Sequence, residues 1–330
     1  MRKLLVLSVA AALACGASFK DQARDAMPSK SAIQMGSPQS AQSASRAPAA
    51  SGAIVQAGPV PASTLGDHAP FFDLTVGVSS TFNGGTAIML GIIEAVTTYE
   101  PTSCTHNSCT WGGPGSGGAL DYNDYKLVVS QAQVGDSFNW ELSGQPKNSS
   151  SGFIVFMSGT AKPGPQKHHG SGSFDVDFDK AALLPGPHDA TGQLHVTSYS
   201  NVGPAKLEVN YVGAKDSQHP GQKNDVLYSY ANDLTGGGDL DFAVHNTTSG
   251  DRFSVHSRWK NDGRGRADVA GTGTWGSVSL SECWGAAPFS VVYFNSTLTI
   301  NLPPWGSATP QGSESACAFS PAAFSPKTAQ

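Results

Sequence analysis

Charged residues are scarce in this chain of 330 residues, and their scarcity excludes whole classes of fold. Asp, Glu, Lys and Arg together make up 14% of the sequence, whereas an average soluble domain has about 25%. A coiled coil or a charge-rich helical bundle is therefore excluded. Glycine and proline are abundant instead, with 38 and 21 residues. This composition favours short strands joined by many turns.

Clusters of basic residues are also lacking. The formal net charge is −5, and Lys and Arg are scattered along the chain. A nucleic-acid-binding surface needs a clustered basic face, and attraction to anionic lipid needs a polybasic segment. We therefore expect no nucleic-acid partner and no electrostatic attachment to a membrane.

The N-terminus has the pattern of a signal peptide. Arg2 and Lys3 precede an uncharged apolar run, Leu4–Ala14. Its 11 residues are too few for a bilayer span, which needs about 20. A positive start followed by a short apolar run is typical of a secretory signal. Residues 1–14 are therefore interpreted as a signal peptide, and the protein is expected to be exported.

Cys15 follows this run directly and adds a lipid anchor to the prediction. Ala12-Leu13-Ala14-Cys15 resembles the lipobox of bacterial lipoproteins, in which the cysteine thiol is diacylglycerated and becomes the new N-terminus. Ala12 departs from that pattern, because the family usually has Leu there. Gly16 in place of Asp resembles the pattern of lipoproteins that travel to the outer membrane. The alternative is a chance cysteine after an ordinary signal peptide.

The cysteine count supports lipidation. The chain has five cysteines, which are Cys15, Cys104, Cys109, Cys283 and Cys317. An odd number in an exported protein leaves one thiol to explain, and lipidation of Cys15 leaves four. Four cysteines allow three connectivities. The choice that is local in sequence pairs Cys104 with Cys109 and Cys283 with Cys317.

Composition divides the remaining chain into three parts. Residues 20–66 contain no aromatic residue, and runs such as Ser37–Ser45 have no apolar period. A segment of this kind buries too little surface to offset its ordering entropy. We therefore expect a disordered, lipid-anchored linker over residues 15–66. A single β domain is expected over residues 67–317 and a disordered tail over 318–330.

Strict alternation of apolar and polar residues dominates the domain. Period two with one apolar face is typical of half-buried antiparallel strands. The segments that show it are Phe72–Val78, Phe138–Leu142, Phe174–Phe178, Leu207–Tyr211, Leu240–Val244 and Phe253–Trp259. Turn signals separate them, with no room for helical crossovers. The fold is therefore predicted to be mainly β. About a dozen strands would form an up-and-down meander that curls into a barrel or half-barrel.

One segment breaks this alternation. Thr86–Tyr99 places Ile88, Ile92 and Val96 at helical spacing, and Pro101 would end a helix there. We predict one short helix near the start of the domain. A lone apolar helix beside a curved meander is expected to pack into the concave side of the sheet.

No standard catalytic or metal motif is present. The chain has neither a G-x-S-x-G elbow nor H-E-x-x-H. Asp175–Asp179 lacks the glycine of a calcium loop and is interpreted as a solvated strand face. His106 between Cys104 and Cys109 lacks the further ligands of a zinc site, so a disulfide is favoured in an oxidising compartment. His168-His169 is interpreted as a polar turn. We predict no catalytic residue, metal or cofactor.

Glu282 is the position of greatest chemical interest. Alternation places it on the same face as Val278, Leu280 and Trp284, where an unpaired carboxylate is costly. By strand order, Arg258 and Arg266 are the nearest cations, with Asp268 beyond them. A buried ion pair of Glu282 with one of these arginines is expected. A ligand-orienting charge in a cavity and an exposed glutamate at a strand end are the alternatives.

Six tryptophans are also present. Large aromatic residues on alternating strands are usually core residues. A glycan-stacking surface is the alternative.

A set of short strings resembles an uncharacterised family of predicted bacterial lipoproteins. These are Trp111–Pro114 with Leu120–Leu127, Ser257–Trp259 with Gly265–Asp268, Ser281–Trp284 and Ala316–Phe319. The resemblance covers about residues 71–319. It implies no assigned activity and no catalytic residues. It does imply that Cys283 and Cys317 belong to one structural unit.

These observations predict a non-catalytic, monomeric protein of the bacterial outer membrane or periplasm. Its membrane contact is expected through the lipid anchor, and its partner is an apolar small molecule or an envelope component. An apolar or amphiphilic ligand is expected in the concave sheet, because a dozen half-apolar strands enclose more apolar surface than one helix covers. A structural or interaction module of the envelope is the first alternative. A hydrolase with a non-standard site is the second.

Overall fold

A computed structural model describes most of the chain. It covers residues 18–38, 63–116, 121–133, 136–166, 169–186, 190–215, 221–233, 235–274, 276–300 and 308–322. The expected signal peptide, Cys15, His168 and the end of the expected tail lie outside the described residues, as does the part of the expected linker from 39 to 62.

Two α-helices and a 3₁₀ turn precede a long run of strands, and two short helical elements follow later in the chain. The helical elements are α1 (Phe19–Ala26), a 3₁₀ turn (Lys30–Ala32), α2 (Pro70–Thr98), α3 (Phe178–Ala181) and a 3₁₀ turn (Glu314–Ala316). The strands are β1 (Ser103–Cys104), β2 (Ser108–Gly112), β3 (Asn123–Gln131), β4 (Phe138–Pro146), β5 (Ile154–Pro163), β6 (Gly170–Asp177), β7 (Gln193–Ser200), β8 (Lys206–Lys215), β9 (Lys223–Asn232), β10 (Gly238–Asn246), β11 (Arg252–Trp259), β12 (Gly265–Gly273), β13 (Gly276–Trp284), β14 (Val291–Ile300) and β15 (Ala308–Gly312).

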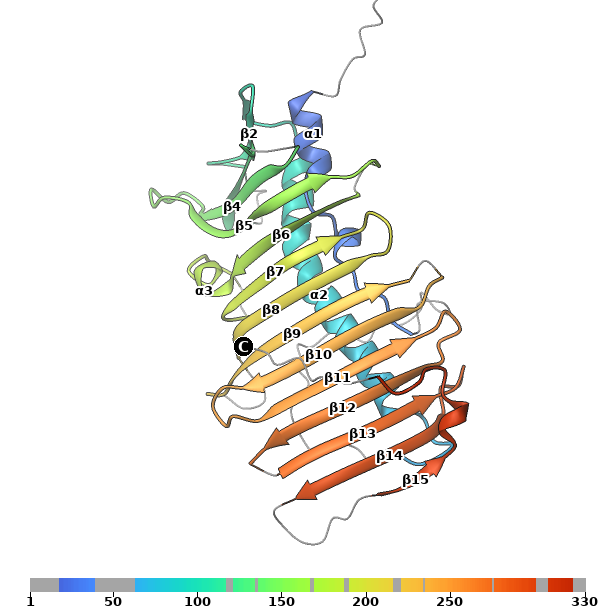
Figure 1. The fold of residues 1–330 in the computed structure, drawn as a ribbon. Coiled ribbons are helices and arrows are strands. Elements are labelled where there is room, and N and C mark those ends of the chain that lie inside the picture. The colour runs from blue at the N-terminus through green and yellow to red at the C-terminus, as the bar shows by residue number, and fades with distance from the viewer. Residues whose placement is uncertain are drawn as a thin grey trace, which may run out of the picture.

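All 15 strands form one antiparallel sheet in sequence order, which confirms the predicted meander. Each strand pairs with the next one along the chain, so the sheet is open, with β1 and β15 as its edges (Figure 1). The two edge strands have only two and five residues. Short edge strands give other chains little backbone to pair with.

Helix α2 covers the concave face of this sheet, as predicted, but it begins earlier than the sequence indicated. We predicted a helix over Thr86–Tyr99 and a strand over Phe72–Val78; the structure has one helix over Pro70–Thr98, so the strand prediction is wrong. Proline at the first helical position favours this start. The buried residues of α2 recur at steps of one, three or four, which is a helical stripe: Phe71, Phe72, Thr75, Val78, Ser79, Phe82, Thr86, Leu90, Ile93 and Thr97.

The length of α2 matches the width of the sheet that it crosses. The 29 residues of α2 extend about 43 Å at 1.5 Å per residue. Nine strand spacings of about 4.8 Å give a similar distance, and α2 contacts both β3 and β12. Phe82 packs against Tyr228 of β9, and Phe72 against Trp284 of β13. The helix is also long and apolar enough to cross a membrane, by length and composition alone.

Aromatic residues fill the space between α2 and the sheet. Trp111, Trp140, Trp259 and Trp284 are all buried in one continuous hydrophobic core. The interpretation of these four tryptophans as core residues is therefore confirmed.

A second element lies beside α2, where we had expected disorder. Residues 18–38, here termed the N-terminal strap, run alongside α2 in the opposite direction (Figure 1). Its buried side chains include Met27, Ile33 and Met35. The linker prediction is therefore wrong for residues 18–38. A few aliphatic and methionine side chains are enough to attach this segment, although it lacks aromatic residues between 20 and 38.

Reciprocal hydrogen bonds hold the strap against the middle of α2. Asn83 accepts the backbone N–H of Met35 at 2.8 Å and donates its amide to the Met35 carbonyl at 2.8 Å. Near the C-terminus of α2, Lys30 pairs with Glu94 at 3.2 Å. These contacts fix the position of the strap along the helix.

Replacing Asn83 should therefore loosen the strap. In Asn83→Ala both backbone groups of Met35 lose their partner, which should cost about 1–2 kcal/mol of unfolding free energy. Tryptic cleavage after Lys30 should become faster, as measured by limited proteolysis. Asn83→Asp keeps the acceptor for the Met35 N–H but loses the donor, so its rate of tryptic cleavage should lie between those of the wild type and Asn83→Ala. Unchanged cleavage in Asn83→Ala would contradict this account of the strap.

Candidate functional site

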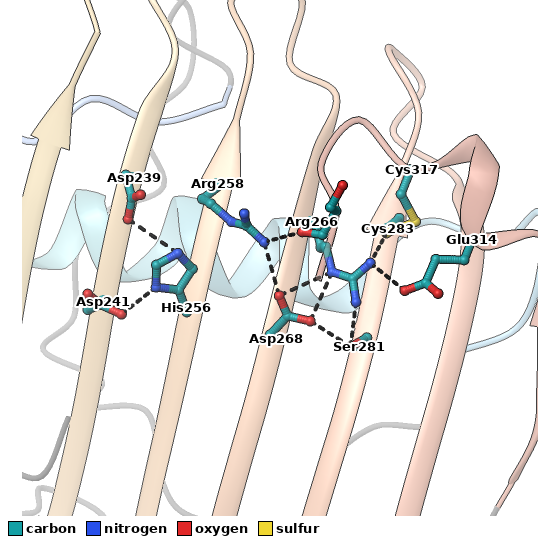
Figure 2. Close-up of polar contacts among 11 residues, drawn as sticks. Asp239, Asp241, His256, Arg258, Arg266, Asp268, Ser281, Cys283, Glu314 and Cys317 are labelled. Atoms are coloured by element: carbon teal, nitrogen blue, oxygen red, sulfur yellow. Dashed lines mark hydrogen bonds and ion pairs between the residues drawn. A yellow bond between two sulfur atoms is a disulfide. The ribbon is translucent and has the colours of Figure 1, made fainter. Parts of the chain in front are cut away.

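Polar side chains of the described residues gather at two places on the sheet. The first is beneath the N-terminus of α2 on the concave face, around Glu282. The second is a row on the convex face of β10–β13 (Figure 2). Neighbouring residues of one strand face opposite sides, so Glu282 and Cys283 belong to different groups.

Glu282 caps α2 from outside the helix. Its carboxylate is fully buried and accepts the backbone N–H of Phe71 at 2.9 Å. The hydroxyl of Ser63 donates to its other oxygen. Ala69 is the N-cap residue of α2 and gives no side-chain hydrogen bond. Glu282 therefore satisfies a free N–H of the first turn, and its charge lies at the favourable end of the helix dipole.

The expected ion pair between Glu282 and an arginine is wrong. The face assigned to Glu282 is correct, but its partner in register on β12 is Ala267. Arg266 lies opposite Cys283, and Arg258 lies opposite Arg266. Alternation therefore sends both arginines to the convex face. The order of the strands predicts which strand lies next to Glu282, but it does not predict which side chains of that strand share its face of the sheet.

Aromatic and ionic contacts complete the docking of the first turn of α2. Phe72 stacks on Phe289 with ring centroids 4.0 Å apart. The imidazole of His68 contacts Asp73 at 2.8 Å through Nε2 and the Pro288 carbonyl at 3.1 Å through Nδ1. The hydrogen bond with Asp73 raises the pKa of His68. The N-terminal end of α2 is thus attached to β13 and to the loop that follows it.

Burial sets the protonation of Glu282. Removal from water raises the pKa of this carboxyl from 4.5 to about 7, against the opposing effect of the bonds from Ser63 and Phe71. The folded protein then binds the proton more tightly than the unfolded chain does. The free energy of unfolding should therefore fall as pH rises from about 4.5 to about 7.

The variant Glu282→Gln tests this dependence. The glutamine carbonyl can still accept from Phe71, but it does not titrate. Between pH 5 and pH 8 the wild type should lose up to about 3 kcal/mol more unfolding free energy than the variant, as measured by urea denaturation. His256 titrates in both proteins, so the difference reports on Glu282 together with its charge coupling to His68. Parallel pH profiles would show that Glu282 is not the group responsible.

The row on the convex face consists of two lines of residues in register across four strands. Asp239, Arg258, Arg266 and Cys283 form one line, and Asp241, His256, Asp268 and Ser281 form the other (Figure 2). The two arginines lie opposite each other. Asp268 relieves their repulsion, because its carboxylate contacts Arg266 at 2.9 Å and Arg258 at 3.2 Å.

Arg266 is the most enclosed charge in this row. Its side chain is 2% exposed and also donates to Ser281 at 2.9 Å and to Glu314 at 2.9 Å. Its Nη1 lies 3.9 Å from the sulfur of Cys283. Fixed guanidinium geometry suits such a set of simultaneous acceptors.

The C-terminal segment, residues 308–322, contacts the part of this row formed by Arg258, Arg266 and Cys283. The Cys283–Cys317 disulfide joins it to β13, and Glu314 reaches back to Arg266. Arg258 donates to the Ser320 carbonyl at 2.9 Å and lies 5.2 Å from the centre of the Phe319 ring. The structure thus places residues 318–320 on the sheet, where a disordered tail had been expected to begin.

Both predicted disulfides are present in the structure. Cys104 pairs with Cys109 across the β1–β2 hairpin, and Cys283 pairs with Cys317. The first disulfide leaves no free thiolates beside His106 for zinc. Two disulfides are typical of a protein in an oxidising, exported environment.

Arg266 should matter far more for stability than its exposed neighbour Arg264. Arg266→Ala leaves Asp268 buried with one remaining arginine, which should cost about 3–5 kcal/mol. Arg264→Ala breaks only the exposed pair with Asp262 and should cost at most about 1 kcal/mol. Urea unfolding of both variants gives the comparison. Similar losses in the two variants would contradict the structural role of Arg266.

His256 lies between two carboxylates of β10. Its Nδ1 is 2.6 Å from Asp241, and its Nε2 is 3.5 Å from Asp239. Burial opposes the charged form of His256, but the hydrogen bond with Asp241 and the negative charges of Asp241 and Asp239 together outweigh it and raise the pKa. The three residues have the ligand atoms that a divalent cation requires. Both ring nitrogens already face an aspartate, so the geometry is also that of a protonated histidine between two acids.

The other sequence-predicted positions have structural roles. Asp177 caps α3 by accepting the Lys180 N–H at 2.9 Å, and Asp175 contacts His195 at 2.6 Å. Phe178, which we had placed in a strand, begins α3. His169 bonds to the Asn201 carbonyl at 3.0 Å, which fits the predicted polar turn.

A void of about 10 Å³ lies between α2 and β10–β11, lined by residues such as Leu74, Val78 and Phe242. One water molecule would fill it. At the other end of the sheet, the indole N–H groups of Trp111 and Trp140 are buried without a hydrogen-bond partner among the described residues. Such donors favour an acceptor nearby.

Sequence reasoning missed the partners of the residues that it singled out. Ser63 and Phe71 hold Glu282, and Glu314 holds Arg266. Each of these partners lies 48 or more positions along the sequence from the residue that it contacts. The signal available was limited to alternation, which placed Asp239, Asp241 and His256 on the polar face of their strands.

We compared the chain with family models, curated proteins and solved structures, and none of the three comparisons found a match. The resemblance to predicted bacterial lipoproteins therefore stays a prediction. What the protein does has to be inferred from its own geometry.

Proposed function

We propose that this is an exported, lipid-anchored and non-catalytic protein of the bacterial envelope that holds an apolar or amphiphilic ligand against its concave sheet. One observation carries the proposal. The concave face of an open, 15-stranded sheet is covered by one helix and the N-terminal strap. A second sheet or a closed barrel would bury such a face permanently, whereas a single helix can move.

The composition of α2 supports a cover that moves. Gly77, Gly84, Gly85 and Gly91 lie within the helix, and each lowers its intrinsic stability by about 1 kcal/mol relative to alanine. The helical form therefore depends on packing against the sheet. A ligand that replaces this packing need not compete with a strongly helical segment.

The polar attachments of α2 are concentrated near its ends and along the strap. Glu282 and His68 hold the N-terminal end, and Lys30 holds the C-terminal end through Glu94. Between them, the hydroxyl groups of Thr75 and Ser257, 2.7 Å apart, join the buried side of α2 to β11. Beneath the helix, an acyl chain would gain about 0.8 kcal/mol for each buried methylene group.

The N-terminal sequence supports the location. The signal-peptide pattern of residues 1–14 is followed directly by Cys15, and the two disulfides use the remaining four cysteines. A diacylglyceryl group on Cys15 would hold the protein on a bacterial membrane, with the outer membrane favoured by Gly16.

A structural or interaction module of the envelope is the second candidate. The favouring observation is the close packing of α2 on β10–β11, where the void beside Leu74 is only about 10 Å³ in volume. The convex face, closed by the disulfide-linked C-terminal segment, would then present the contact surface. The experiment below separates the two candidates.

A disulfide that locks α2 to the sheet should abolish ligand binding. The hydroxyl oxygens of Thr75 and Ser257 are 2.7 Å apart, so the double variant Thr75→Cys/Ser257→Cys is expected to crosslink α2 to β11. Wild-type protein purified gently from the envelope should retain lipid in native mass spectrometry, and delipidated protein should bind a palmitate probe saturably. The oxidised double variant should bind at least tenfold less.

The two single cysteine variants are the matched controls and should bind like the wild type. Equal palmitate binding by the locked and wild-type proteins would place the ligand elsewhere. Absence of lipid and of palmitate binding in the wild type would favour the interaction module.

A further inference from the structure

The distance along the chain between Cys15 and the folded domain is short. Ser18 is the first described residue, and α1 begins at Phe19. Three residue steps from Cys15 to Ser18 span at most about 10 Å, since an extended chain covers about 3.3–3.6 Å per residue. A linker that stayed free up to residue 66 would instead give a root-mean-square reach of about 40 Å.

Helix α1 is firmly part of the domain. The Phe19 ring packs against Phe138 of β4 with centroids 5.7 Å apart, and Ala23 is fully buried. Lys20 pairs with Glu100 at 2.8 Å, just after the C-terminus of α2. Arg24 donates to the Tyr99 carbonyl at 3.0 Å. The start of α1 therefore has a fixed position at the β2–β5 end of the sheet (Figure 1).

We propose that this end of the molecule, formed by α1 and Tyr99–Glu100, rests on the lipid bilayer that carries the acylated Cys15. The inference rests on the lipid anchoring in the proposed function. The bilayer is the partner that this end contacts, because an acylated Cys15 lies within about 10 Å of Ser18 along the chain. The long axis of the sheet then points away from the membrane, with β15 at the distal end.

The side chains at this end are compatible with contact to a bilayer surface that the lipid anchor brings close. Tyr99 is 74% exposed, and tyrosine favours the boundary between headgroups and acyl chains. Lys20 and Arg24 are already bonded to Glu100 and to the Tyr99 carbonyl. The contact should therefore form equally on neutral and anionic lipid.

The orientation also deepens the proposed function. Trp111 on β2 and Trp140 on β4 lie at the same end of the sheet as α1. Their buried indole N–H groups, unpartnered among the described residues, then lie at the end of the sheet that faces the bilayer. An amphiphile that enters the concave face from the membrane could accept hydrogen bonds from these indole N–H groups.

Labels at the two ends of the lipidated full-length protein test the orientation. A fluorophore is attached to Tyr99→Cys and, separately, to Ser315→Cys, which is exposed near β15. The proteins are bound to phosphatidylcholine vesicles that carry a nitroxide on the lipid headgroup, with and without phosphatidylglycerol. Quenching at position 99 should exceed quenching at 315 several-fold on both lipids. Equal quenching at the two positions would overturn the proposal.

Two controls separate this inference from the anchor itself. Cys15→Ser should no longer float with vesicles; if the wild type also fails to float, and its mass lacks a diacylglyceryl group, then the proposed anchoring has failed. Ala23→Glu puts a charge into the buried face of α1 and should release it. Quenching at position 99 should then fall toward that at 315, provided that Ala23→Glu still floats and keeps its unfolding transition. Unchanged quenching would show that α1 does not set the orientation.

Discussion

Every part of this protein depends on the fit between one apolar helix and one open sheet. Within the part of the chain that the structure describes, no second layer of strands packs on the sheet, so its concave face stays dry only while α2 covers it. The length of α2 equals about nine strand spacings, and a single buried carboxylate, Glu282, fixes where the helix begins. This bond joins β13 to the first turn of α2, so it sets the position of the whole helix along the sheet. The bond also has an acidic group that titrates near neutrality, which couples the attachment of α2 to pH.

The alternation of β13 connects the two faces of the molecule. Glu282 points inward to α2, and Cys283, the next residue, points outward to the disulfide that holds the C-terminal segment. On the outer side, Arg266 ties that segment to the sheet through Glu314. The helix near the start of the chain and the segment near its end are thus both fastened to adjacent residues of one strand. We infer that β13 is the strand whose loss would disturb both layers at once.

The sequence was informative wherever the relevant period was short and local. Alternation predicted the meander and the face of Glu282, and spacing predicted both disulfides. The prediction from alternation failed over Phe72–Val78, because the apolar residues there fit both a two-residue and a helical period. The β-branched residues of this segment also favour a strand. Packing on a wide apolar sheet decides such an ambiguous segment. The partners of Glu282 and Arg266 could not be predicted, because they are set by which segment covers each face. The N-terminal strap was missed for a related reason: Met27, Ile33 and Met35 acquire a burial partner only once α2 is in place.

The order of the elements along the chain has a consequence for biogenesis. Translation and export proceed from the N-terminus, so α2 emerges before every strand that it covers. The strands that complete its platform, β12 and β13, are among the last to appear. During that interval an apolar segment of 29 residues has no sheet to pack on and is prone to aggregation. If the protein is exported as we propose, its export should depend on a holdase chaperone that shields α2 until the final hairpins have formed.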